Sequence, residues 1–208
     1  MAKLGERRNG NCVKASMTPE DYAQAWNRAV PIQTYLDDQL SAVVDEAHPY
    51  APYYSINQQR VRRLSQRLRL EAETESAVLN AKSGTKWLIL SETWCGDAAQ
   101  SMPVLAAMAR ASNGRIEARV LYRDENLDLM DQFLTNGGRS IPKVIQLDGS
   151  FGVTADWGPR PAEAQELVQR IKSDPERDHL YNEELHKWYA IDRQHAIQRE
   201  VRELISNA

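Results

Sequence analysis

The sequence predicts an α/β fold in which strands and helices alternate through the middle of the chain. Short apolar runs at 86–91 and 115–122 are each followed by a segment with helical periodicity. A third apolar run, 141–147, ends at Asp148-Gly149, a pair typical of a hairpin turn. Helical patterns before and after these segments predict additional helices at both ends.

The chain is long enough for one sizeable core, because 208 residues lie within the usual range of a single domain. Residues 1–16 are polar and show no periodicity, so we expect a disordered tail there. We expect residues 17–208 to form a single domain. Its parts would be a helical extension over 17–55, a core over about 57–173 and a long C-terminal helix over 175–206.

The predicted extension begins at a clear helix start. Thr18 is a candidate N-cap, Pro19 fits the first helical position and Asp21 lies in the first turn. Pro31 should break this helix. Helical spacing then resumes to about residue 46, and a proline- and tyrosine-rich loop follows at 48–53.

A long helix is predicted over 57–82. Val61, Leu64 and Leu68 form its apolar stripe, and Gly84 is suited to end it. Its other face carries five arginines, at positions 60, 62, 63, 67 and 69. They would suit a phosphate or an acidic partner, but three glutamates follow at once, which favours a solvated helix face.

The remaining elements follow in order. The patterns predict strand 86–91, helix 96–111, strand 115–122, helix 125–134, the strand after Ile141-Pro142, a return strand over 151–156 and helix 160–173. Asp174 and Pro175 then restart a helix that runs to about Ser206.

The segment Trp94-Cys95-Gly96-Asp97-Ala98 carries the clearest chemistry. It places a cysteine between a strand and a helix, where backbone N–H groups and the helix dipole favour a thiolate. Asp97 opposes this effect, because a nearby negative charge raises the pKa of a thiol. Ala98 stands where a second cysteine would close a disulfide within the turn. An inert, partly buried Cys95 is the alternative.

This turn resembles the active-site turn of the thioredoxin superfamily, and its Cys-Gly-Asp-Ala form resembles a bacterial thioredoxin-like subgroup. Ile141-Pro142 resembles the step in that superfamily where a cis-proline lies beside the active-site cysteine; Pro142 follows Cys95 by 47 positions. The resemblance covers about 57–173. It implies a thioredoxin-like central mixed sheet flanked by helices, with extra N-terminal helices and a long C-terminal helix.

The resemblance also implies a site. Cys95 would be the nucleophile, and a substrate groove would be formed by Trp94, Gly96, Asp97, Ile141 and Pro142. Dithiol relatives carry a buried carboxylate six residues before the cysteine, and this chain has Ile89 there. The expected chemistry is therefore that of a single thiol.

Two functions follow. The first is monothiol thiol–disulfide exchange through mixed disulfides at Cys95, with a protein or a low-molecular-weight thiol or disulfide as partner. Arg139 and Lys143 are candidates for recognising a carboxylate of a small thiol. The second is a non-catalytic thioredoxin-fold binding or adaptor protein, which the alanine at position 98 and Ile89 favour.

Composition excludes several other classes. A net charge of −3 gives no reason to expect nucleic acid or a membrane as partner, and no apolar stretch approaches the length of a membrane span. Two cysteines favour a reducing, cytoplasmic setting. We expect no cofactor, and no metal because the four histidines are scattered.

Two further features of the sequence each allow two interpretations. Cys12 is either a resolving thiol for Cys95 or, as we favour, a thiol without function. The bulky residues outside the core either pack the added helices onto it, which we favour, or form a docking surface or a homodimer interface; they are Trp26, Tyr50, Tyr53, Tyr54 and Trp188.

Overall fold

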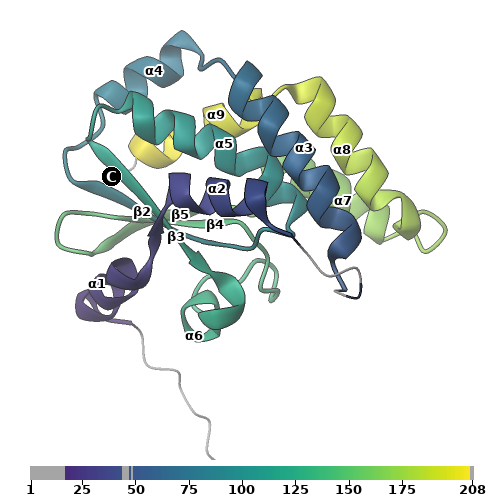
Figure 1. Cartoon of the computed structure of the whole chain (residues 1–208), viewed down its shortest axis with the longest axis horizontal. Helices are drawn as coiled ribbons and strands as arrows, with labels where there is room; N and C mark the ends of the chain where they lie inside the picture. Colours follow the sequence, from purple (N-terminus) through teal and green to yellow (C-terminus); the bar gives the residue numbers. More distant parts are fainter. Residues whose placement is uncertain (1–16, 44–46, 48, 207–208) are drawn as a thin grey trace, which may run out of the picture.

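The computed structural model describes residues 17–43, 47 and 49–206. The predicted tail over 1–16, including Cys12, lies outside the described residues. Figure 1 shows a twisted sheet with α2, α3, α4, α5, α8 and α9 stacked on one side and α1 and α6 on the other. No helix in the described part of the chain is long and apolar enough to span a bilayer.

Helices and strands follow one another along the chain in a mixed order. They are α1 (Pro19–Arg28), β1 (Val30–Pro31), α2 (Ile32–Ser41), α3 (Ala51–Arg67), α4 (Ala72–Leu79), β2 (Thr85–Ser91), α5 (Gly96–Ala111), β3 (Ile116–Tyr122), the 3₁₀ turn η1 (Arg123–Glu125), α6 (Leu127–Met130), β4 (Lys143–Leu147), β5 (Val153–Trp157), α7 (Ala162–Lys172), the 3₁₀ turn η2 (Asp178–Leu180), α8 (Tyr181–Asp192) and α9 (His195–Ser206).

The sheet is mixed and has the strand order β1-β3-β2-β4-β5. Strands β2 and β3 are parallel, while β4 is antiparallel to β2 and β5 is antiparallel to β4. Strand β2 is central, and its residues Trp87 to Leu90 are fully buried. A continuous apolar run is the pattern expected of a strand covered on both faces. The predicted α/β fold with a mixed central sheet is therefore confirmed.

The extension begins as predicted. The Thr18 side chain accepts a hydrogen bond from the Asp21 N–H, and the Asp21 carboxylate accepts one from the Thr18 N–H, which forms a capping box. Trp26 is buried in the core. The short strand β1, which the sequence did not predict, pairs antiparallel with β3.

The predicted helix over 57–82 is wrong in one respect, because the chain forms two helices there. Helix α3 already begins at Ala51, within the predicted loop, and ends at Arg67. The Gln198 side chain on α9 then holds the extended linker: it accepts from the Glu71 N–H at 2.9 Å and donates to the Arg69 carbonyl. These bonds replace the helical ones that 68–71 would otherwise make.

The C-terminal helix is also divided. Arg193 and Gln194 adopt left-handed backbone conformations with φ of 52° and 66°, which ends α8. Asp192 then accepts the Ala196 N–H and starts α9. Helix 125–134 is reduced to η1 and the single turn α6.

Candidate functional site

Cys95 lies at the N-terminus of α5, just after the central strand. It is the N-cap of that helix and is 7% exposed. Its Sγ–H donates to the carbonyl oxygen of Ile141 at 3.3 Å, and the peptide bond between Ile141 and Pro142 is cis. The fold thus brings Cys95 beside the Ile141-Pro142 step, as the resemblance implied.

Amide side chains from α2 and α3 hold the turn before Cys95. Gln39 of α2 donates to the carbonyl of Thr93 at 2.9 Å, and Asn57 of α3 donates to the carbonyl of Trp94 at 2.8 Å. Both amides are buried. These residues fix the backbone that presents the thiol, and no sequence motif marks either of them.

Trp94 forms part of the wall beside the thiol. Its ring stacks on Tyr50 with 4.3 Å between centroids, and the guanidinium of Arg123 lies 5.4 Å from its centroid. Tyr50 and Tyr53 are 40% and 45% exposed at this pocket. The tyrosines of the extension therefore help to line the site.

Asp97 is a buried carboxylate that accepts three hydrogen bonds. Arg160 donates to its Oδ2 from Nε at 3.0 Å and from Nη2 at 2.5 Å, and the Tyr189 hydroxyl donates to Oδ1 at 2.7 Å. A buried charge needs such partners, because removal from water is costly. Asp97 therefore joins α5 to Arg160 and to α8 as well as acting on the thiol.

The environment raises the pKa of the Cys95 thiol to about 12. Burial is the largest cause, and the negative charge of Asp97 adds to it. The N–H groups of Ala98 and Asp97 and the charge of Arg160 act in the opposite direction. The sequence anticipated the contest between helix and carboxylate but not the larger effect of burial. At neutral pH the resting group is a thiol.

His186 of α8 lies over the active-site turn. A Cβ atom at Gly96 would lie 3.3 Å from Cε1 and Nε2 of the His186 ring, so the glycine makes room for the imidazole. Burial lowers the pKa of His186 to about 4, with the charge of Arg60 as a further cause and Asp97 opposing both. His186 is therefore neutral at physiological pH.

A pocket of about 300 Å³ opens beside Cys95. Its lining includes Trp94, Gly96, Asp97, Ile141 and four arginines, at positions 60, 123, 139 and 160. Arg139 forms a two-pronged ion pair with Asp131, and Arg123 pairs with Asp124. Pro142 is buried and lies behind the lining.

Two sequence expectations for this site need correction. Lys143 is not placed to recognise the carboxylate of a small thiol. It is buried, and its Nζ donates to Asp156 at 2.8 Å and to the carbonyl of Gly158. Arg60 does not belong to a solvated helix face, because it lines the pocket and donates to Asn57.

The position six residues before Cys95 lies inside the core. Ile89 is fully buried in β2 and pairs with Val144, so the position offers no proton-transfer group. Within the described ranges, no group of three or more His, Cys, Asp or Glu side chains gathers in a way that would hold a metal ion.

Comparison with known proteins places this geometry in a family. A family model described as thioredoxin matches residues 44–172. A crystal structure of a protein of unknown function from Pseudomonas aeruginosa has a TM-score of 0.66 at 18% identity and covers 89% of this chain and 96% of its own. An HIV epitope-scaffold has a TM-score of 0.64 at 17% identity, with coverage of 90% and 98%.

These two likenesses concern the fold, since the identities are low. No curated protein matches the chain. The family model spans the active-site turn, the central strands and the Ile141-Pro142 step. The chain belongs to the thioredoxin family.

Proposed function

We propose that this chain is a monothiol thiol–disulfide exchange protein of the bacterial thioredoxin-like subgroup, acting through mixed disulfides at Cys95. The observation that carries the proposal is the position of the Cys95 sulfur. It lies at the first N–H groups of α5, 3.3 Å from the carbonyl before Pro142 and on the wall of a pocket. Helix N–H donors stabilise a thiolate, which is the nucleophile in exchange.

The proposed reaction needs one protein thiol and an external thiol. Cys95 gives its proton to solvent, and its thiolate attacks one sulfur of a substrate disulfide. The substrate S–S bond breaks, and the leaving sulfur departs as a thiolate that takes up a proton. A second thiol, from a low-molecular-weight compound or a protein, then loses its proton and attacks the substrate sulfur of the mixed disulfide. A new disulfide forms between these two sulfurs, and the Cys95 sulfur leaves as a thiolate and takes up a proton. No cysteine at position 98 competes for this step.

The surroundings of Cys95 suggest how substrate would engage. In the resting site the Ile141 carbonyl accepts the thiol proton. Once that proton leaves, the carbonyl is available to a backbone N–H of an extended substrate, in the manner of strand addition. Trp94, Gly96, Asp97 and Ile141 would form the groove, with Pro142 shaping it from behind.

A second candidate function is supported by a specific observation. The thiol is buried and its pKa is raised to about 12, so little thiolate exists at neutral pH. A non-catalytic binding or adaptor protein would use the same pocket to hold a partner. Both candidates suit a protein or low-molecular-weight partner in a cytoplasmic setting.

An exchange assay separates the two candidates. Wild type, Cys12→Ser and the Cys12→Ser, Cys95→Ser double variant are incubated with a peptide–glutathione mixed disulfide and reduced glutathione, and peptide release is followed. We expect equal acceleration by the first two proteins and none by the double variant. Equal rates with all three would contradict exchange at Cys95. Retained binding of the oxidised peptide by the double variant, without turnover by wild type, would support the adaptor.

A further inference from the structure

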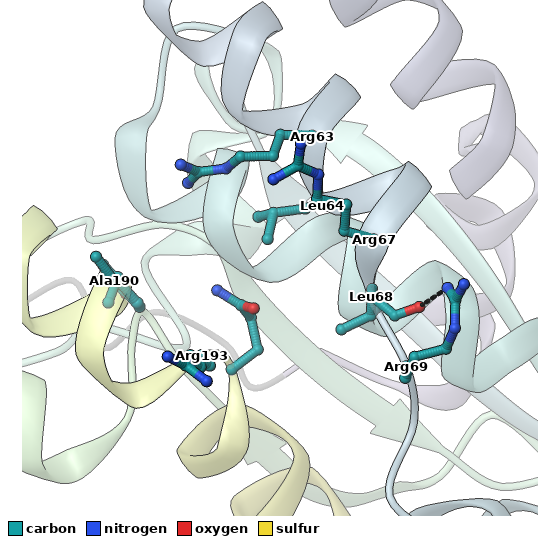
Figure 2. A pocket seen from close by; sticks show the side chains of 9 residues that line it. Arg63, Leu64, Arg67, Leu68, Arg69, Ala190 and Arg193 are labelled. Carbon is teal, nitrogen blue, oxygen red and sulfur yellow. Dashed lines mark hydrogen bonds between the residues drawn. The ribbon is translucent and has the colours of Figure 1, made fainter.

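A second cavity lies away from Cys95, between α3 and the corner that joins α8 to α9. Its volume is about 530 Å³. Figure 2 shows four arginines around it: Arg63 and Arg67 from α3, Arg69 from the linker and Arg193 from the corner. Between them lie Leu64, Leu68 and the edge of α8. The cavity is thus an apolar hollow with a cationic rim, and none of the described residues that line it is acidic.

The four arginines have no anionic partner in the part of the chain that the structure describes. Arg69 donates from Nη1 to the Leu68 carbonyl at 2.8 Å, and no ion pair involves any of the four. All four side chains are exposed. Like charges gathered in this way repel one another, so an anion bound among them would relieve the repulsion.

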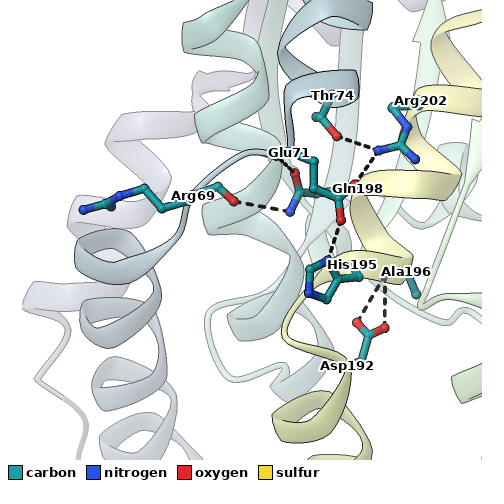
Figure 3. Close-up of polar contacts among 8 residues, drawn as sticks. All are labelled: Arg69, Glu71, Thr74, Asp192, His195, Ala196, Gln198 and Arg202. Atoms are coloured by element: carbon teal, nitrogen blue, oxygen red, sulfur yellow. Dashed lines mark hydrogen bonds and ion pairs between the residues drawn. The ribbon is translucent and has the colours of Figure 1, made fainter.

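The carboxylates nearest in sequence are already engaged. Figure 3 shows Glu71 between His195 and Arg202, hydrogen-bonded to both, with the Arg202 Nη1 at 2.5 Å. Asp192 accepts the Ala196 N–H at 3.1 Å and caps α9. Neither carboxylate can turn to the arginines without giving up these bonds. The positive charge of the rim is therefore left for an external group.

The backbone holds the rim in place from two sides. Arg193 and Gln194 occupy consecutive left-handed conformations, which are costly for residues other than glycine and often mark functional sites. Gln198 fixes the linker by bonding the Arg69 carbonyl and the Glu71 N–H (Figure 3). The backbone at Arg69 and Arg193 is thus anchored.

We propose that this cavity binds a small molecule bearing two or more phosphate groups. The guanidinium is planar and donates in pairs to phosphate oxygens, and several of them together suit adjacent phosphates. A volume of about 530 Å³ lies within the range of small-molecule sites. Leu64 and Leu68 would contact the organic part of the ligand. The site is separate from the exchange chemistry of Cys95.

Calorimetric titration at low ionic strength tests the proposal. The probes are sodium tripolyphosphate and ATP, added to wild type, to Arg67→Gln with Arg193→Gln, and to Arg110→Gln with Arg170→Gln. The last pair removes the same charge from exposed helix positions outside the cavity. We expect saturable binding to wild type and to the control. The cavity variant should bind at least about tenfold more weakly, because each arginine supplies charge-assisted hydrogen bonds.

Other results of the titration would overturn the proposed phosphate site. No saturable binding, or equal weakening in the cavity and control variants, would overturn the proposal. Binding of tripolyphosphate alone would indicate free polyphosphate, and binding of ATP alone a phosphate ester; both keep the proposed chemistry. Vesicles containing a phosphoinositide serve as a third probe, and binding to them alone would refute a small-molecule site. The Cys95→Ser variant should bind as wild type does, which keeps this test independent of exchange activity.

Discussion

Two arginine-lined pockets in one molecule differ in what their arginines contact. Beside Cys95, Arg160 is held by Asp97 and Arg139 by Asp131. In the cavity between α3 and the α8–α9 corner, Arg67 and Arg193 form no ion pair with any described residue. Paired arginines of the first kind build the protein. Arg60 of the Cys95 pocket differs from both kinds, because it is half-buried and donates to Asn57. Arginines without an ion pair in a concave site are suited to an external anion.

The largest expected effect comes from breaking the buried pair. Arg160→Gln should lower the free energy of unfolding by about 3–5 kcal/mol, because it leaves the Asp97 carboxylate buried without its cation. The pair is well buried, with side-chain exposures of 14% and 8%. Urea denaturation at pH 7 measures the loss.

Two controls sharpen this prediction. Arg199→Gln removes an exposed partner of Glu163, with side-chain exposures of 45% and 58%, and should cost less than about 1 kcal/mol. Adding Asp97→Asn to Arg160→Gln should restore part of the stability, since position 97 then no longer carries a buried charge without a partner. Equal losses for Arg160→Gln and Arg199→Gln would mean that the Asp97 pair is not structural.

The next effect concerns Tyr189, which connects the two pockets. One side of this residue lines the arginine cavity, and its hydroxyl donates to Asp97 at 2.7 Å. Tyr189→Phe should cost about 1–3 kcal/mol of unfolding free energy, as expected for a lost hydrogen bond to a buried charge. Tyr53→Phe, at an exposed tyrosine, should change it little. The reverse order in thermal or urea unfolding would contradict the role of this bond.

Asp97 also sets the acidity of the thiol. Its charge raises the pKa of Cys95, so Asp97→Asn should lower that pKa from about 12. Burial, the larger cause, remains, so the pKa should stay above the free-cysteine value of about 8.5. At a fixed pH below both values, iodoacetamide should then react faster, by close to tenfold for each unit of pKa lost.

The measurement is the pH dependence of alkylation, read by mass spectrometry in a Cys12→Ser background. Glu163→Gln, which removes a surface carboxylate paired with Arg199, serves as the control and should leave the rate unchanged. An unchanged or higher thiol pKa in Asp97→Asn would show that the carboxylate does not oppose ionisation.

The smallest expected effect is a pH dependence of stability from His186. Its pKa falls to about 4 in the folded state, against about 6.5 for a free histidine. As pH falls from about 6.5 to about 4, the unfolded chain takes up a proton that the folded chain does not, so stability declines. His186→Gln should flatten the profile over this window, and His179→Gln, at an exposed position, should not. Urea midpoints across the window decide between them.

Local patterns predicted the parts of the fold that depend on local structure. The strand and helix around Cys95, the capping box at Thr18 and the hairpin after β4 all follow from neighbouring residues. The division between α3 and α4 does not. It depends on a bond from the Glu71 N–H to Gln198, which lies 127 positions away.

The residues of the candidate site also fall into two groups, those that a local motif marks and those that only the tertiary structure brings together. The sequence led to Cys95 and Ile141 because a motif marks each of them. Arg160 and Tyr189 reach Asp97 from 63 and 92 positions away, and no short-range pattern connects them. The burial that raises the thiol pKa is likewise a tertiary property. The sequence therefore indicates the candidate thiol and Asp97, but not the partners of Asp97 or the burial that raises the thiol pKa.

The most direct test of the central claim is whether Cys95 forms a mixed disulfide. The Cys12→Ser protein and its Cys95→Ser derivative are incubated with oxidised glutathione, quenched in acid and analysed by intact mass and peptide mapping. We expect one glutathione adduct, located on Cys95, that excess reduced glutathione removes and that the Cys95→Ser protein lacks. No adduct on Cys95, even at alkaline pH where the thiolate forms, would contradict it.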